Sequence, residues 1–256
     1  MVSHFLGVQS DISKGRNFRT IEEISEVQIR GVNPVPHRRV KQFNSKGSIV
    51  SDIIYNSAGG TSRETNWEYI DGVNLRRKHH RFFANIIGWQ EEEVVIDWDS
   101  TTNLPQHIKV TKNGRVWQTA IIQPDTLGRI ESARVLNANG GHVFTERFMY
   151  LESSNMIRIT VFRPNGVFQS TWSYPIDRSK PFSFESVKRQ YYPNGDVMVE
   201  TLTNAVKGDQ AYFYEYEYDG QGNWIERNNY QVELGRNDRI RRKKLEHKIT
   251  RTITYQ

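Results

Sequence analysis

The chain has 256 residues and a formal net charge of +6 at pH 7, because 35 lysines and arginines outnumber 29 aspartates and glutamates. It contains no cysteine, which excludes disulfides and thiolate metal sites. No stretch reaches the apolar length needed to span a bilayer, so we expect no transmembrane segment. The first residues also lack the charged region and apolar run of a secretory signal.

The pattern of apolar residues in the N-terminal region is irregular up to residue 17 and ambiguous after it. Residues 1–17 are polar and irregular, and we expect them to be loosely attached. Apolar residues from Phe18 to Val27 recur at every third position, as on a short helix, whereas Val27 and Ile29 alternate with polar residues, as in a strand. We predict a strand that ends at Gly31.

A turn signature recurs from about residue 40 to the C-terminus. It reads as an Asn or Asp, two further residues and a Gly, and in three copies an Asn stands directly before the Gly. In a type I turn the first side chain accepts backbone hydrogen bonds, and a fourth residue in the left-handed region joins two antiparallel strands. We expect all eight copies to share this one register. Their glycines are Gly47, Gly59, Gly114, Gly128, Gly140, Gly166, Gly195 and Gly222.

The segments between these turns alternate as strands do. In the segment 212–218, every second residue is a tyrosine, so one face of the strand is formed by tyrosines only. The recurrence of the turn glycines along the chain indicates a repeated supersecondary unit. We therefore predict an all-β fold of repeated antiparallel hairpins, forming a long curved meander sheet, an incomplete barrel or a shell. No composition break divides the chain, so we expect an irregular segment at 1–17 and a single β-domain at 18–256.

The segment from Tyr216 to Trp224 resembles the YD repeat of Rhs and teneurin-type proteins, whose core is Tyr-x-Tyr-Asp-x-x-Gly before an apolar residue. Weaker copies stand at 43–49, 98–104 and 124–130, and the chain is also similar to short YD-like proteins of Bacteroidetes. The resemblance implies a bacterial β-shell or open sheet, and it favours a periplasmic or secreted location. Most copies here lack the Tyr-Asp pair, which puts a regular spiral in doubt.

Basic side chains gather in two clusters. The first contains Arg76, Arg77, Lys78 and Arg81, and the second lies between 236 and 248 and contains Arg241, Arg242, Lys243 and Lys244. Such clusters can hold nucleic acid, an anionic glycan or a lipid headgroup, or they can guard an exposed sheet edge. Neither has the interleaved aromatic residues of single-strand nucleic-acid binders, which disfavours nucleic acid without excluding it.

One carboxylate pair with catalytic spacing is Asp97 and Asp99, which flank Trp98 and fall on one face of an extended strand. Asp99 also stands where a turn favours an aspartate, so a structural role competes. His79 and His80 are adjacent, point to opposite faces in a strand and cannot chelate one ion together. The sequence predicts no metal site and no cofactor.

These observations favour a non-catalytic binding scaffold over an enzyme. The partner is a protein or an envelope glycan, bound through a sheet face or edge. Two alternatives stay open: a hydrolase whose groove brings together distant residues, and a polyanion-binding protein that uses the two basic clusters.

Overall fold

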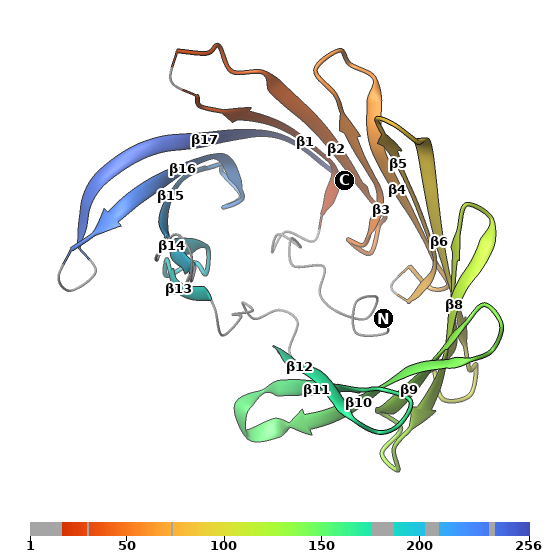
Figure 1. Cartoon of the computed structure of the whole chain (residues 1–256). Helices are drawn as coiled ribbons and strands as arrows, with labels where there is room; N and C mark the ends of the chain where they lie inside the picture. The colour runs from red at the N-terminus through yellow and green to blue at the C-terminus, as the bar shows by residue number, and fades with distance from the viewer. Residues whose placement is uncertain (1–16, 30, 73, 176–186, 203–209, 236–238) are drawn as a thin grey trace. The chain divides into compact units, whose positions relative to one another are not determined.

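The computed structural model describes residues 17–29, 31–72, 74–175, 187–202, 210–235 and 239–256, and the predicted irregular segment lies almost wholly outside them. Within this part of the chain, seventeen strands and one 3-10 helix form (Figure 1). They are β1 (Phe18–Val27), β2 (Pro36–Phe43), β3 (Ile49–Tyr55), β4 (Thr61–Tyr69), β5 (Leu75–Ala84), β6 (Gly88–Trp98), β7 (Pro105–Lys112), β8 (Arg115–Pro124), β9 (Ile130–Asn137), β10 (His142–Leu151), η1 (Glu152–Ser154), β11 (Met156–Phe162), β12 (Phe168–Pro175), β13 (Val187–Tyr191), β14 (Val197–Leu202), β15 (Gln210–Tyr218), β16 (Trp224–Leu234) and β17 (Ile240–Tyr255).

Strand pairing follows chain order, and the pairs are antiparallel. Successive strands pair from β4 to β12 and again from β13 to β17. The N-terminal strand β1 then pairs with β17 on one side and with β2 on the other, and β2 pairs with β3. Figure 1 shows β1 and β17 side by side although they stand at opposite ends of the sequence. The predicted all-β meander of antiparallel hairpins is confirmed.

The chain divides into two compact units. Among the described residues, 63–175 belong to one, which we call the central unit, and 17–62 together with 187–256 belong to the other, the terminal unit. A single β-domain over 18–256 stays a prediction. No helix in the described part of the chain is long and apolar enough to cross a membrane.

The central unit has an apolar core on one face of its strands. In β6, Val94 and Ile96 alternate with more exposed residues, so both side chains point to the same face. The same alternation in the next three strands extends this face. The buried cluster consists of Val94, Ile96, Ile108, Val110, Ala120, Ile122, Ile130, Ala133 and Val135.

The terminal unit begins with β1, which confirms the predicted strand and excludes the helix. The strand ends at Val27 and not at Gly31 as predicted. The reason is that ladder pairing with β17 ends at Val27, opposite His247, and Gly31 takes a positive φ of 77° in the turn that follows.

The turn glycines adopt the predicted left-handed conformation, with φ between 72° and 88°. In seven copies, the N–H of this glycine donates to the carbonyl oxygen of the residue three places earlier, as between Gly140 and Asn137. The expectation of one register for all eight copies is wrong for Gly114. There, Asn113 also has a positive φ of 47°, and Lys112 pairs directly with Arg115. This is a two-residue hairpin turn, in which Asn-Gly satisfies two consecutive left-handed positions.

Candidate functional site

The predicted acid pair lies at the end of β6. Asp97 is exposed and paired in register with His107. One oxygen of Asp99 accepts hydrogen bonds from the backbone N–H groups of Thr101, at 2.8 Å, and Thr102, at 2.7 Å. These bonds, that of Thr102 foremost, lower the pKa of Asp99. They favour the turn role for Asp99, and catalysis by the pair stays an untested alternative.

The first basic cluster lies on β5, where alternation divides it between two faces. Arg77 pairs with Glu93 and Glu68, and Arg81 pairs with Glu64 at 2.6 Å. On the opposite face, Lys78 is half-buried, and burial lowers its pKa. Arg76 shares that face and is exposed. The structure thus does not present these four cations as one surface.

The second basic cluster lies on β17, and its four cations are exposed. Arg242 pairs with Glu233 at 3.5 Å on the neighbouring strand, and Lys243 pairs with Glu215. Arg241 and Lys243 alternate with the other two cations along the strand, so this cluster is also divided between faces. Binding of a partner by either cluster stays a prediction.

The two histidines of β5 have separate partners. His79 lies 3.9 Å from Glu91, and the ring Nδ1 of His80 lies 2.8 Å from the hydroxyl of Thr65. Across the described residues, no three His, Asp or Glu side chains gather in a way that could hold a metal ion.

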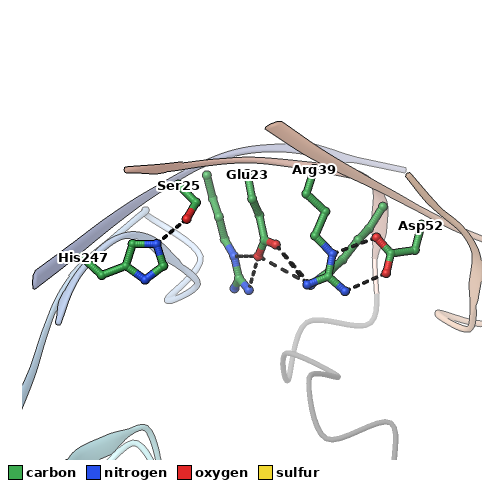
Figure 2. Close-up of polar contacts among 7 residues, drawn as sticks. Glu23, Ser25, Arg39, Asp52 and His247 are labelled. Carbon is green, nitrogen blue, oxygen red and sulfur yellow. Dashed lines mark hydrogen bonds and ion pairs between the residues drawn. The ribbon is translucent and has the colours of Figure 1, made fainter. Parts of the chain in front are cut away.

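A polar cluster that the sequence did not reveal lies in the terminal unit (Figure 2). Register places Glu23 of β1 opposite Arg251 of β17 and Arg39 of β2. The Glu23 carboxylate lies 2.6 Å from Arg251 Nη2, 3.3 Å from Lys41 Nζ and 3.8 Å from Arg39 Nη1. Arg39 also forms a bidentate pair with Asp52, at 2.6 and 2.7 Å. We call these five residues the ion cluster.

Electrostatics in the ion cluster favour the charged form of Glu23. Its side chain is only 10% exposed, and burial by itself would raise the pKa of Glu23. The charges of Lys41 and Arg251 oppose this effect, and the net pKa lies below the usual value. A carboxylate held ionised by three cations is suited to linking strands and not to donating a proton.

Beside the ion cluster, Ser25 of β1 forms a hydrogen bond with the imidazole of His247 (Figure 2). A serine next to a histidine is the first element of a nucleophilic pair. Such a pair needs the imidazolium to be stabilised when it forms. Here burial first, then the charges of Arg227 and His37, lower the pKa of His247. This environment disfavours the imidazolium, so the pair does not support nucleophilic catalysis.

On β15, β16 and β17, cations lie against aromatic rings. The guanidinium of Arg227 lies 5.2 Å from the ring centroid of Trp224 and 5.7 Å from that of Tyr214. Arg251 lies over Trp224 from the neighbouring strand, at 3.2 Å. Within the described part of the chain, two buried polar atoms have no hydrogen-bond partner, Arg227 Nε and Asn229 Oδ1.

A recess of the terminal unit forms where β14 and β15 separate. Their ladder extends from Leu202 opposite Gln210 to Val199 opposite Phe213, although β15 continues to Tyr218. Beyond this point, tyrosine hydroxyls connect the strands. The Tyr216 hydroxyl donates to the Val197 carbonyl at 3.0 Å, and the Tyr192 hydroxyl donates to the Tyr214 carbonyl at 2.9 Å.

The resulting recess, which we call the tyrosine groove, has a volume of about 570 Å³. The Tyr216 and Tyr218 rings are stacked, with centroids 6.0 Å apart and an interplanar angle of 30°. Tyr192 meets Tyr216 edge to face. The groove is lined by Tyr192, Pro193, Asn194, Glu215, Tyr216, Glu217, Tyr218 and Asn228.

The groove combines neutral phenols with carboxylates. Burial raises the pKa of Tyr218 to about 12, and it also raises the pKa values of Tyr192 and Tyr216. The hydrogen bond from Lys243 lowers the pKa of Glu215, which is therefore ionised at neutral pH. At neutral pH the groove offers aromatic surface, hydroxyl groups and hydrogen-bond acceptors, with a negative charge.

The sequence indicated this site only in part. The alternation of segment 212–218 predicted the face formed by tyrosines. It did not show that the turn carrying Tyr192 and Asn194 lies beside this face, where Asn194 Nδ2 donates to the Tyr218 hydroxyl at 2.8 Å. The signal available was the second aromatic turn, Tyr192-Pro193-Asn194-Gly195, about one hairpin earlier in the chain.

No protein-family model matches this chain, and no curated protein matches it. Several solved structures are similar to it, including the following two. A porin-like protein from Bacteroides uniformis ATCC 8492 is 14% identical with a TM-score of 0.43, over 93% of this chain and 98% of that one. The Tc holotoxin pore of Photorhabdus luminescens is 11% identical with a TM-score of 0.35, over 84% of this chain and 14% of that one. At these values neither likeness gives this chain a function, and membership of the YD-repeat family stays a prediction.

Proposed function

We propose that this chain is a non-catalytic β-scaffold that binds a glycan in the tyrosine groove. The observation that carries the proposal is the stacked pair Tyr216 and Tyr218 beside the amide of Asn194 and the carboxylate of Asp196, in a recess of about 570 Å³. This volume lies within the range of small-molecule sites. The C–H faces of a sugar pack on aromatic rings, and its hydroxyls need fixed acceptors and donors.

The charge of the groove narrows the type of glycan. Glu215 and Glu217 line it, and Asp196 accepts a hydrogen bond from Tyr218 at 2.9 Å. Lys243 is paired with Glu215, so its charge is already offset there. A neutral or amino sugar therefore fits, whereas a uronic acid or a sulfated sugar would be repelled.

The ionisation of Glu215 supports binding without hydrolysis. A glycosidase needs one carboxylic acid that is protonated at working pH, which requires a raised pKa. Glu215 has the opposite shift.

A peptide partner is the second candidate. The ladder between β14 and β15 ends at Phe213, whereas β15 continues for five further residues. A peptide could add to a strand there and place its side chains against the tyrosines.

Binding of neutral and amino oligosaccharides, measured by calorimetry against a panel that includes acidic ones, tests the proposal. Glu217→Gln keeps the shape of the side chain and removes a charged acceptor. We expect it to weaken binding about tenfold or more, since hydrogen bonds to charged groups contribute about 1.5–3 kcal/mol. Tyr218→Ala should weaken binding as well, because it removes one stacked ring.

Glu233→Gln is the matched control, because Glu233 is an exposed glutamate of the neighbouring strand and does not line the groove. It should leave the affinity unchanged. The proposal fails if no member of the panel binds, or if Glu217→Gln and Tyr218→Ala bind as the unaltered chain does. Release of shorter saccharides during incubation would contradict the non-catalytic part.

A further inference from the structure

An exposed apolar surface stands at one end of the central unit, and it is independent of the tyrosine groove. The hairpin between β5 and β6 turns through Asn85, Ile86 and Ile87. Ile86 is 98% exposed and Ile87 is 72% exposed. Phe83 and Trp89, on the strands below, are about half exposed and meet edge to face with centroids 5.7 Å apart.

The geometry of this turn does not require isoleucine. The Ile87 N–H donates to the Ala84 carbonyl, and Gly88 supplies the positive φ of 80°. Any polar residue would satisfy positions 86 and 87, and the other hairpin turns described above carry Asn, Asp, Gly or Pro. Two adjacent exposed apolar side chains, with further exposed apolar residues behind them, mark a site for an apolar partner.

A second hairpin extends the surface. Asn113, in the turn between β7 and β8, is joined to β6: its N–H donates to the Glu91 carbonyl at 2.9 Å, and its side-chain oxygen accepts from the Glu91 N–H at 2.8 Å. Trp117 of this hairpin is 52% exposed. We call the exposed apolar residues of these two hairpins the apolar end. Alternation places them on both faces of the strands behind the two turns, and they are Phe82, Phe83, Ile86, Ile87, Trp89, Val116 and Trp117.

A cationic side chain lies against the ring of each exposed tryptophan of the apolar end. The Arg81 guanidinium lies 5.0 Å from the Trp89 ring, and the Lys112 ammonium lies 4.7 Å from the Trp117 ring. Both cations also contact carboxylates, Arg81 at Glu64 and Lys112 at Glu92. Aliphatic side chains at a tip, with tryptophans and cations behind them, match the layers of a bilayer surface: hydrocarbon, interface and phosphate.

We propose that the apolar end inserts into the surface of a phospholipid bilayer and attaches the chain to it peripherally. The isoleucines enter the acyl region and the tryptophans lie at the level of the headgroups. Lys112, whose contact with Glu92 is 3.6 Å long, faces the phosphates, whereas Arg81 stays paired with Glu64. A projecting tip suits this role better than a protein interface, because Ile86 is almost fully exposed.

Sedimentation of the full chain with vesicles of phosphatidylcholine and phosphatidylglycerol tests the proposal. We expect the unaltered chain to bind, and the double variant Ile86→Asn, Ile87→Asn to bind at least about tenfold more weakly. Bromine-labelled acyl chains should quench tryptophan fluorescence in the unaltered chain, and Trp89→Phe should reduce this quenching.

Leu127→Asn is the matched control, because Leu127 is 72% exposed in another turn of the same unit. It should bind vesicles as the unaltered chain does. The proposal is overturned if the unaltered chain does not bind, if the double variant binds equally, or if Leu127→Asn loses binding to the same extent. Self-association that the double variant abolishes, without vesicle binding, would instead identify the apolar end as a protein interface.

Discussion

Glu22 and Glu23 are adjacent in the sequence and lie in opposite environments. Glu22 forms an ion pair with Arg38 at 2.6 Å, and its side chain is 38% exposed. Glu23 is 10% exposed and holds together cations from β2 and β17. Alternation along β1 separates the two side chains, but only the pairing of three strands decides which face is covered. The carboxylates of Glu22 and Glu23 therefore contribute very differently to the stability of the fold.

We expect Glu23→Gln to destabilise the fold by roughly 3–5 kcal/mol, because it leaves buried cations without their carboxylate. Glu22→Gln should cost less than about 1 kcal/mol, because its ion pair is exposed. Urea unfolding followed by circular dichroism measures both. Equal effects of the two substitutions would show that Glu23 is not an organising residue.

The ion cluster also predicts a pH dependence. The pKa of Glu23 is lower in the folded chain than in the unfolded chain, so its contribution to stability is complete above the unfolded pKa of about 4.3 and is lost as the pH falls through the folded pKa. The urea midpoint should fall below about pH 4.3 in the unaltered chain. Glu23→Gln should reduce this decrease, and an unchanged acid profile in that variant would contradict the assignment.

At the scale of elements, the turns are the best-determined part of the chain. The side-chain oxygen of Asn137 accepts the N–H groups of Asn139, at 3.0 Å, and Gly141, at 2.9 Å. A Cβ at position 141 would lie 3.0 Å from the Asn137 amide, so a larger residue there would require this side chain to shift slightly. These are local relations of five residues, and for this reason the sequence predicted them.

We expect Asn137→Ala to destabilise the fold by about 1–2 kcal/mol, because two backbone donors lose their side-chain acceptor. Asn139→Ala in the same turn should change stability by less than about 0.5 kcal/mol, since only its backbone takes part in these bonds. Thermal or urea unfolding of the two variants provides the comparison. If Asn139→Ala were the more damaging substitution, the bonds to the Asn137 side chain would not stabilise this turn.

The register of an individual turn was less predictable. Asn113-Gly114 fits the general signature, yet both residues take positive φ and form a two-residue turn. Asn tolerates the left-handed region, so the residue types permit either geometry. Which one forms depends on the pairing of the flanking strands, here Lys112 with Arg115.

At the scale of the whole molecule, neither predicted cluster gathers the positive charge into a single basic surface. Both predicted clusters lie on strands that divide them between two faces, and carboxylates pair with Arg77, Arg81, Arg242 and Lys243. The composition gives only the total charge, whereas the binding of a polyanion depends on how the charges are distributed over the surface.

We therefore expect weak retention on immobilised heparin, with elution at or below an ionic strength of about 0.15 M. Replacing Arg241, Arg242, Lys243 and Lys244 by Gln should alter the elution only slightly. Strong retention with a steep salt dependence that this replacement removes would favour the polyanion-binding alternative.

The sequence by itself determined the all-β fold, the hairpin turns, the strand at the N-terminus and the tyrosine face of segment 212–218. All of these follow from relations between residues a few positions apart, which backbone geometry and the alternation of strands dictate. The tertiary structure decided the pairing of β1 with β17, the burial of Glu23, the neighbourhood of Tyr192 and Tyr218, and the exposure of Ile86. These depend on which distant strands meet and where a ladder ends, and no local pattern of residue types contains that information.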